Sequence, residues 1–214
     1  MKKLSVLVLA MAAAFGSAQA SVIKVEAATG STPFLGSAEA YRAAVDAALA
    51  GVGYASAMPA SLDFISHQGL FGGNGNFAMK TTVNFGVASA GTWSFRAGVD
   101  FGMGGAMFLD GVAVDFKAND MWWAGEYDNS SQFFEATSAL EAGNHVLTVM
   151  GFEGCCDGGQ QVQFLSDDAS EFVSFSTRDR LDAKLPEPAT LGLAFAGLGL
   201  LGLSRRRKGA ARQA

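Results

Sequence analysis

The stretch that decides the fold of this 214-residue chain runs Gly105-Ala106-Met107-Phe108-Leu109-Asp110-Gly111-Val112-Ala113-Val114-Asp115-Phe116. An Asp-Gly pair between two apolar runs is typical of a type I′ turn, because both central residues of that turn need a positive φ. The stretch therefore predicts an antiparallel hairpin with strands over 105–109 and 112–116.

Short alternating runs continue on both sides of this hairpin, with turn residues between them. Single strands are expected over 77–85 and 92–101. We expect a second hairpin around a Gly- and Cys-rich loop, and then a closing strand; these elements cover 145–152, 160–165 and 171–177. Several short strands with turn signals are typical of an antiparallel β-sandwich or jelly roll. The sequence therefore predicts a mainly β fold with a single sandwich over 62–184.

One helix is expected over 37–50, inside a helical and loop segment that covers 21–61. Its apolar residues recur at helical spacing, and Gly51 follows as a stop signal. Between the two predicted hairpins lies a long and partly irregular connection over 117–140. The prediction is thus one N-terminal helix on an otherwise β domain.

The centre of the predicted sandwich resembles a known family. The residues that carry the resemblance are Thr92-Trp93-Ser94-Phe95-Arg96, Val99-Asp100-Phe101-Gly102 and Ala106-Met107-Phe108-Leu109-Asp110-Gly111. Over about 91–164 they look like the core of a protective-antigen-like β-sandwich, a domain of adhesins, toxins and some glycosidases. Members that bind sugar through calcium use two adjacent aspartates. The matching pair here is Val99-Asp100, so the resemblance implies sugar binding that does not depend on calcium.

The C-terminus carries a three-part pattern. Leu185-Pro186-Glu187-Pro188-Ala189-Thr190 begins it, an uncharged span over 190–203 follows, and Arg205-Arg206-Arg207-Lys208 ends it. The prolines favour an extended linker. The span of about 14 residues is shorter than a comfortable membrane helix, and the basic cluster should stay cytoplasmic.

This order of parts resembles the PEP-CTERM sorting signal, here over 185–214. That signal marks exported proteins of Gram-negative bacteria, which are handed to an exosortase at the inner membrane. The resemblance implies a short C-terminal membrane helix, transient residence in the inner membrane, and a final place at the cell surface or outside the cell. Pro186, Glu187, Pro188, Arg205, Arg206 and Arg207 are the expected signal residues. An ordinary tail anchor is the alternative.

The N-terminus predicts export as well. Lys2 and Lys3 precede an apolar run over 4–15, and Ala18-Gln19-Ala20 forms an A-x-A cleavage pattern. We expect a signal peptide over 1–20, with Ala18 and Ala20 at the site that signal peptidase cleaves. A buried N-terminal helix is the alternative. Cleavage would leave a mature chain that starts at Ser21.

The charge of the central body excludes one class of partner. Seven of the 15 lysines and arginines, but one of the 20 acidic residues, lie in the two terminal segments. The body between them therefore carries a net charge of about −11. Such a surface repels nucleic acid and anionic membranes, so nucleic-acid binding is not expected.

The two cysteines, Cys155 and Cys156, are adjacent in a glycine-rich loop. Export to an oxidising compartment favours a disulfide between them. Cys155-Cys156-Asp157-Gly158 also resembles the Cys-Cys-x-Gly signature of a subset of PEP-CTERM proteins. Intermolecular cross-linking, metal binding with Glu153 or Asp157, and inert thiols are the alternatives. Two sulfurs alone do not make a zinc site.

Chemistry-bearing residues are few. The sequence holds no G-x-S-x-G, H-E-x-x-H, P-loop or dinucleotide fingerprint, so neither an enzyme nor a cofactor is expected. Aromatic residues lie beside carboxylates in the connection, where Trp122 and Trp123 precede Glu126 and Asp128. This pattern suits a platform for sugar, although buried core rings are the alternative.

Two functions follow from these observations. The first is a non-catalytic protein of the cell surface or extracellular matrix that binds extracellular polysaccharide. The second is a secreted polysaccharide hydrolase with a dispersed carboxylate site.

Overall fold

The computed structural model of this chain describes residues 20–179 and 181. Except for Ala20, the expected signal peptide lies outside these residues, and so does the whole expected sorting signal. Within the part of the chain that is described, no helix is long and apolar enough to cross a membrane.

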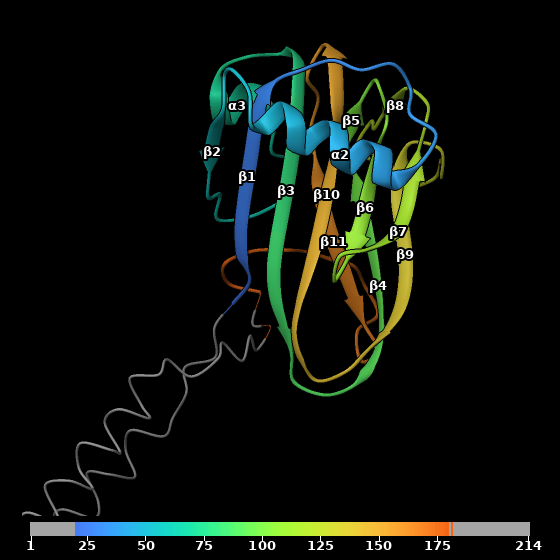
Figure 1. The fold of residues 1–214 in the computed structure, drawn as a ribbon. Coiled ribbons are helices and arrows are strands. Elements are labelled where there is room, and N and C mark those ends of the chain that lie inside the picture. The colour runs from blue at the N-terminus through green and yellow to red at the C-terminus, as the bar shows by residue number, and fades with distance from the viewer. Residues whose placement is uncertain (1–19, 180, 182–214) are drawn as a thin grey trace, which may run out of the picture. The chain divides into compact units, whose positions relative to one another are not determined.

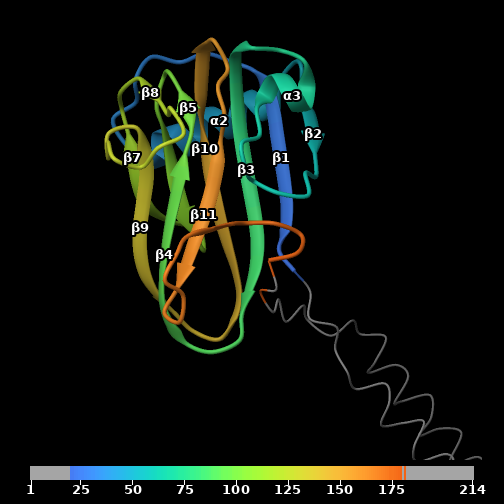
Figure 2. The ribbon, with the colours of Figure 1, turned by 180° about the vertical axis from the view of Figure 1, so that it is seen from behind.

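Two antiparallel sheets face each other and form a β-sandwich (Figures 1 and 2). The first sheet has the order β2-β1-β3-β10-β6-β7. Its strands are β1 (Val22–Thr29), β2 (Ala55–Ala57), β3 (Gly75–Val87), β6 (Gly105–Leu109), β7 (Val112–Lys117) and β10 (Gly143–Cys155). The second sheet has the order β12-β11-β4-β9. Its strands are β4 (Gly91–Gly98), β9 (Phe133–Leu140), β11 (Gln161–Ser166) and β12 (Val173–Ser174). The expected mainly β fold with antiparallel sheets is confirmed.

Aromatic side chains fill the space between the sheets. Phe85 from the first sheet lies 5.7 Å from Phe95 of the second and 5.4 Å from Phe175, measured between ring centroids. All three rings are at most 1% exposed. Each buried ring of this size stabilises the fold by about 1.5–3 kcal/mol, so this cluster holds the two sheets together.

The helix α2 (Ala38–Leu49) confirms the expected helix and covers the outer face of the first sheet (Figure 1). Ser37 caps its start by accepting a hydrogen bond from the Ala40 amide at 3.2 Å. Tyr41 and Val45 are fully buried against that sheet. The second sheet lies on the opposite side of the molecule, in front in Figure 2.

The Asp110-Gly111 hairpin is confirmed. β6 pairs with β7 in antiparallel register, and Leu109 lies opposite Val112. Asp110 and Gly111 have φ values of 51° and 79°, the left-handed conformation that the turn needs.

The expected second hairpin is wrong. β10 belongs to the first sheet and pairs with β3 and β6, whereas β11 belongs to the second sheet and pairs with β4 and β12. The loop between them therefore crosses from one sheet to the other. Alternation shows which side chains face the core, but both sheets face the same core, so it does not identify a strand's partner.

Four strands lie where the sequence predicted none. β1 and β2 lie in the segment 21–61, which was expected to hold a helix and loops, so the sandwich begins at Val22 rather than at residue 62. The short strand β8 (Met121–Trp122) and β9 lie in the connection 117–140. The alanines of β1 and the small polar residues of β9 give a weak apolar pattern, and pairing with β3 and β4 fixes the two strands.

Candidate functional site

A short ribbon extends one end of the sandwich. β5 (Asp100–Phe101) pairs with β8 (Met121–Trp122), so that Asp100 lies opposite Trp122. The helix α3 (His67–Phe71) lies at the same end, as does the C-terminal end of β10 (Figure 1). We call this end of the molecule the β8 end.

The chain alternates between buried and exposed positions from 120 to 128. Met121 and Trp123 are buried, and Tyr127 is partly buried. The residues between them point outward as in an extended strand, where successive side chains face opposite sides. This outward row consists of Asp120, Trp122, Ala124, Glu126 and Asp128, all exposed.

Trp123 is a core residue and is 3% exposed. Its ring packs 5.4 Å from that of Phe64 and 5.4 Å from that of Tyr127. The indole Nε1 donates a hydrogen bond to the Glu126 carbonyl at 2.8 Å. Below the ring lies Gly98, where a Cβ atom would come within 2.1 Å of the indole. Trp123 therefore holds the connection against β4 and does not present its ring to a ligand.

Trp122 faces the other way and is 70% exposed. Its position is fixed through the backbone, because its amide donates a hydrogen bond to Gln132 Oε1 and its strand pairs with β5. The Gln132 amide group also reaches the Asp120 carbonyl at 3.3 Å. A large ring is thus exposed on a backbone that is held in place.

The exposed row forms one wall of an open groove of about 430 Å³. The residues that line it are Asp120, Trp122, Ala124, Glu126, Asp128, Asn129 and Gln132. Three of the four residues that the sequence predicted for a ligand platform, Trp122, Glu126 and Asp128, thus come together, and Trp123 does not line the groove. Among the described residues, no hydrogen bond or ion pair engages the side-chain carboxylates of Asp120, Glu126 or Asp128.

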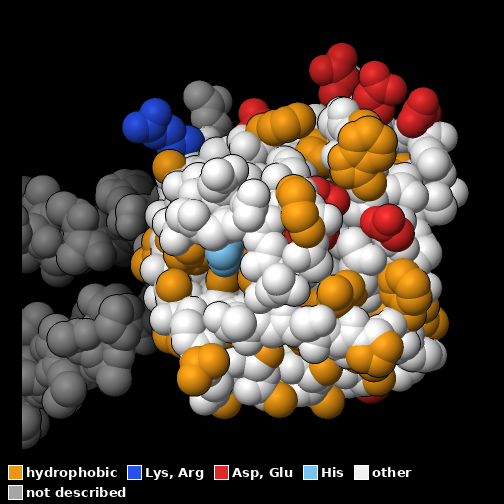
Figure 3. All heavy atoms as spheres, turned by 90° about the horizontal axis from the view of Figure 1, so that it is seen from above, with side chains coloured by type: hydrophobic (Ala, Val, Ile, Leu, Met, Phe, Trp, Pro, Cys, Tyr) orange, Lys and Arg blue, Asp and Glu red, His pale blue; other side chains and the backbone are white. Residues whose placement is uncertain are grey.

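The β8 end is acidic. In the end-on view, Asp and Glu side chains gather on one side, while the Lys and Arg side chains visible in that view lie at the opposite edge (Figure 3). Free carboxylates beside an exposed indole can accept hydrogen bonds from hydroxyl groups while the ring covers an apolar face. They disfavour an anionic ligand.

The cysteine loop lies at the same end. Cys155 and Cys156 are exposed and form a disulfide with an S–S distance of 2.08 Å. Glu153 accepts hydrogen bonds from the amides of Cys155 and Gly102. Asp157 accepts them from the amides of His67 and Gln68, at 3.1 and 2.6 Å, at the start of α3. The two carboxylates thus tie the loop to its neighbours.

These hydrogen bonds of Glu153 and Asp157 argue against metal binding by the cysteine loop. Glu153 and Asp157 were its expected ligands, and both point their oxygens at backbone amides. Within residues 20–179 and 181, no group of three or more His, Cys, Asp or Glu side chains is arranged to hold a metal ion.

Asp100 connects the loop to β8. Its side chain is 4% exposed and lies against the backbone at Gly158, where a Cβ atom would come within 2.4 Å of the carboxylate. Burial, with the negative charges of Glu153, Asp157 and Asp120, raises the pKa of Asp100 to about 7. Burial also raises the pKa of Glu153.

Both histidines are structural. His145 forms hydrogen bonds with the Asp110 carboxylate at 2.7 Å and the Glu141 carbonyl at 2.9 Å. His67 stacks on Phe77 with ring centroids 4.0 Å apart. Neither lines the groove, whereas Asp120, Asn129 and Gln132 do, and sequence reasoning had not selected them. The period-two pattern over 120–128 would have found Asp120.

Comparison with known protein families identifies a motif at the C-terminus. Residues 185–208 match the PEP-CTERM protein-sorting motif, so the chain carries this motif. Proteins with this motif are exported and sorted. No protein in the curated set matches the chain.

Several solved structures are similar in fold. The PA14 domain of the antifreeze protein MpAFP is 15% identical, with a TM-score of 0.48 over 73% of this chain and 87% of that one. The PA14 sugar-binding domain from an RTX adhesin is 13% identical, with a TM-score of 0.47 over 75% and 97%. An anti-sigma factor domain-containing protein is 13% identical, with a TM-score of 0.50 over 79% and 51%. Two of the three are domains of the protective-antigen-like type that the sequence resembles. At these identities the likeness concerns the fold alone.

Proposed function

We propose that this protein is an exported, non-catalytic carbohydrate-binding protein of the cell surface or extracellular matrix, and that its ligand lies against Trp122. The observation that carries the proposal is the position of Trp122. This ring is 70% exposed, it is fixed by β5 and by Gln132, and it forms a wall of the groove at the β8 end.

The groove suits a sugar for two chemical reasons. The flat face of an indole can cover the C–H face of a pyranose ring, and a fixed backbone reduces the entropy lost on binding. Carboxylate and amide side chains around the ring accept and donate hydrogen bonds to hydroxyl groups. Because three carboxylates surround Trp122, the ligand is a neutral or cationic glycan rather than a uronic-acid polymer.

Hydrolysis is the weaker alternative. A glycosidase needs a carboxylic acid held protonated next to a second carboxylate at the scissile bond. Among the described residues, Asp100 and Glu153 have a raised carboxyl pKa, but both are buried and neither lines the groove. The groove is therefore better suited to binding than to bond cleavage.

The termini determine where binding takes place. Signal peptidase removes residues up to Ala20, the C-terminal span stops transiently in the inner membrane, and an exosortase processes the chain near Pro188. The PEP-CTERM match at 185–208 supports this route. The groove at the β8 end would then meet polysaccharide outside the cell.

A glycan array tests the binding function. The exported protein is screened with and without a chelator, beside the Trp122→Ala variant. We expect neutral glycans to bind with and without chelator, and the variant to lose about five- to thirty-fold in affinity, since stacking on one aromatic ring contributes roughly 1–2 kcal/mol. Equal binding by Trp122→Ala would contradict the proposed site. Turnover of the bound polysaccharide would favour the hydrolase.

A further inference from the structure

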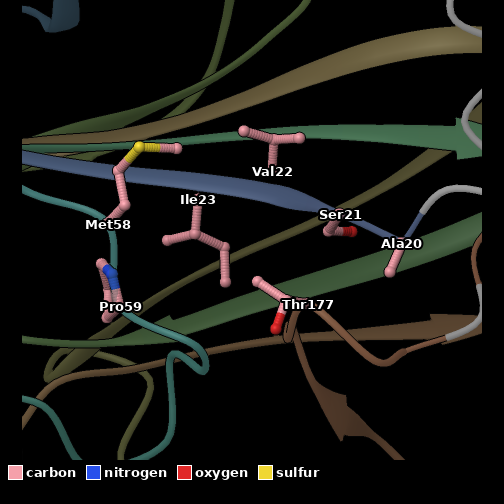
Figure 4. A pocket seen from close by; sticks show the side chains of 7 residues that line it. All are labelled: Ala20, Ser21, Val22, Ile23, Met58, Pro59 and Thr177. Atoms are coloured by element: carbon pink, nitrogen blue, oxygen red, sulfur yellow. The ribbon is translucent and has the colours of Figure 1, made fainter.

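A second hollow lies where the described chain begins. It has a volume of about 230 Å³ and lies beside the start of β1 (Figure 4). Its lining residues are Ala20, Ser21, Val22, Ile23, Met58, Pro59 and Thr177. It contains none of the residues of the β8 groove.

Ser21 is 2% exposed in this hollow, and its two polar groups differ in their partners. Its backbone N–H donates to Asp179 Oδ1 at 3.2 Å. Its hydroxyl is buried and has no hydrogen-bond partner among the described residues. A buried polar group without a partner destabilises the folded state. The chain with Ala20 attached therefore leaves one group at this position unsatisfied.

Asp179 is held in place by backbone amides. Its Oδ2 accepts a hydrogen bond from Ser176 at 3.1 Å, and its Oδ1 accepts one from Leu181 at 3.3 Å as well as that from Ser21. Ser176 in turn bridges to Ser61 across the sheet edge. No lysine or arginine among the described residues pairs with Asp179. A fixed carboxylate therefore points at the nitrogen of Ser21 without a cationic partner there.

We propose that Asp179 is the binding site of the mature protein's own α-ammonium group. This rests on the proposed export, with cleavage after Ala20. Water is added across the Ala20–Ser21 peptide bond. The C–N bond breaks, the water oxygen becomes part of the new Ala20 carboxylate, and both protons of the water end on the Ser21 nitrogen, which becomes an ammonium. The same nitrogen that donates one amide hydrogen bond to Asp179 then forms an ion pair with it.

Cleavage gives both polar groups of Ser21 better hydrogen-bonding partners. A charged donor strengthens the hydrogen bond to the carboxylate. Loss of Ala20, which lines the hollow, opens it beside the Ser21 hydroxyl and lets water reach that group. Processing therefore locks the start of β1 to the segment that follows β12, and the mature protein is more stable than its precursor.

Periodate tests this directly, because it cleaves the Cα–Cβ bond of an N-terminal serine and leaves an internal serine intact. The exported full chain is treated with periodate in the native and in the denatured state, and the mass of its N-terminal peptide is measured. We expect native oxidation to be at least about ten-fold slower than denatured oxidation, since the group reacts only when this segment opens. Asp179→Asn should remove most of that protection, whereas Asp168→Asn, at an exposed position, should leave it unchanged.

The outcomes separate the possible failures. No oxidation of the denatured chain would show that the mature N-terminus is not Ser21, which overturns this proposal and leaves glycan binding at Trp122 untouched. Equally rapid native and denatured oxidation would show an accessible N-terminus and would overturn the ion pair alone.

Thermal unfolding distinguishes the ion pair from a purely structural role of Asp179. Two glycines inserted between Ala20 and Ser21 preserve the A-x-A site and move the new ammonium away. We expect Asp179→Asn to lower the melting temperature by about 3 °C or more in the chain that begins at Ser21, and by clearly less in the extended chain. The same decrease in both chains would contradict the proposal.

Discussion

Trp122 and Trp123 are neighbours in sequence with opposite roles. The residue types beside Glu126 and Asp128 were enough to predict a ligand platform, but not to decide which ring serves it. The alternation over 120–128 separates them: Trp122 lies on the exposed face, and Trp123 packs on Gly98. That contact joins residues far apart in the chain, and no local pattern predicts it.

The two tryptophans should therefore respond differently to truncation. Trp123→Ala removes a ring that is 3% exposed and leaves a cavity, so we expect a loss of about 3–5 kcal/mol in the free energy of unfolding. Trp122→Ala should change that free energy by less than about 0.5 kcal/mol, as is usual for an exposed side chain. Urea unfolding of both variants measures the difference. A larger loss for Trp122→Ala than for Trp123→Ala would reverse the assignment of core and surface.

Asp100 should make stability depend on pH. Its pKa of about 7 in the fold lies above the unfolded value, so the folded chain binds the proton more tightly. Stability from this group is therefore present at low pH and is lost as pH rises through about 7. We expect the free energy of unfolding to fall by about 2–3 kcal/mol more between pH 5 and pH 8 in wild type than in Asp100→Asn. Parallel pH profiles for the two proteins would contradict this.

At the scale of elements, local signals were reliable and partner choice was not. The Asp110-Gly111 turn and the α2 pattern each depend on residues close in sequence, and both were predicted. β10 and β11 were identified as strands, but their partners lie in different sheets, and the sequence does not encode that choice locally. β1 was missed because its alanines carry little apolar contrast.

The cysteine loop is the element that joins the core to the β8 end. Glu153 and Asp157 hold it through backbone amides, and Cys155–Cys156 closes it between them. We expect no free thiol in the denatured mature protein without reductant and two after reduction, and a monomer on a non-reducing gel. Two thiols before reduction would exclude the disulfide, and a reducible dimer would indicate cross-linking instead.

For the whole molecule, sorting and binding are separable. Replacing Arg205, Arg206 and Arg207 with Glu removes the positive charge that should keep the tail cytoplasmic. We expect this variant to be mislocalised or left unprocessed, because the three replaced arginines belong to the motif at 185–208. Cell fractionation and intact-mass measurement show either result. The purified variant should still bind glycan. Normal localisation and processing would argue against the sorting signal.

Glycan binding depends most on the ring of Trp122, and the fluorescence of that ring gives the most direct test. Trp93 and Trp123 are 8% and 3% exposed, so ligand stacking should alter mainly the emission of Trp122. The exported protein is titrated with polysaccharide from the producing cells, beside Trp122→Phe and a control variant, Tyr54→Ala, whose exposed ring does not line the groove. We predict a saturable blue shift in wild type and Tyr54→Ala that is absent from Trp122→Phe. An unshifted wild type, or an equal shift in Trp122→Phe, would contradict the account.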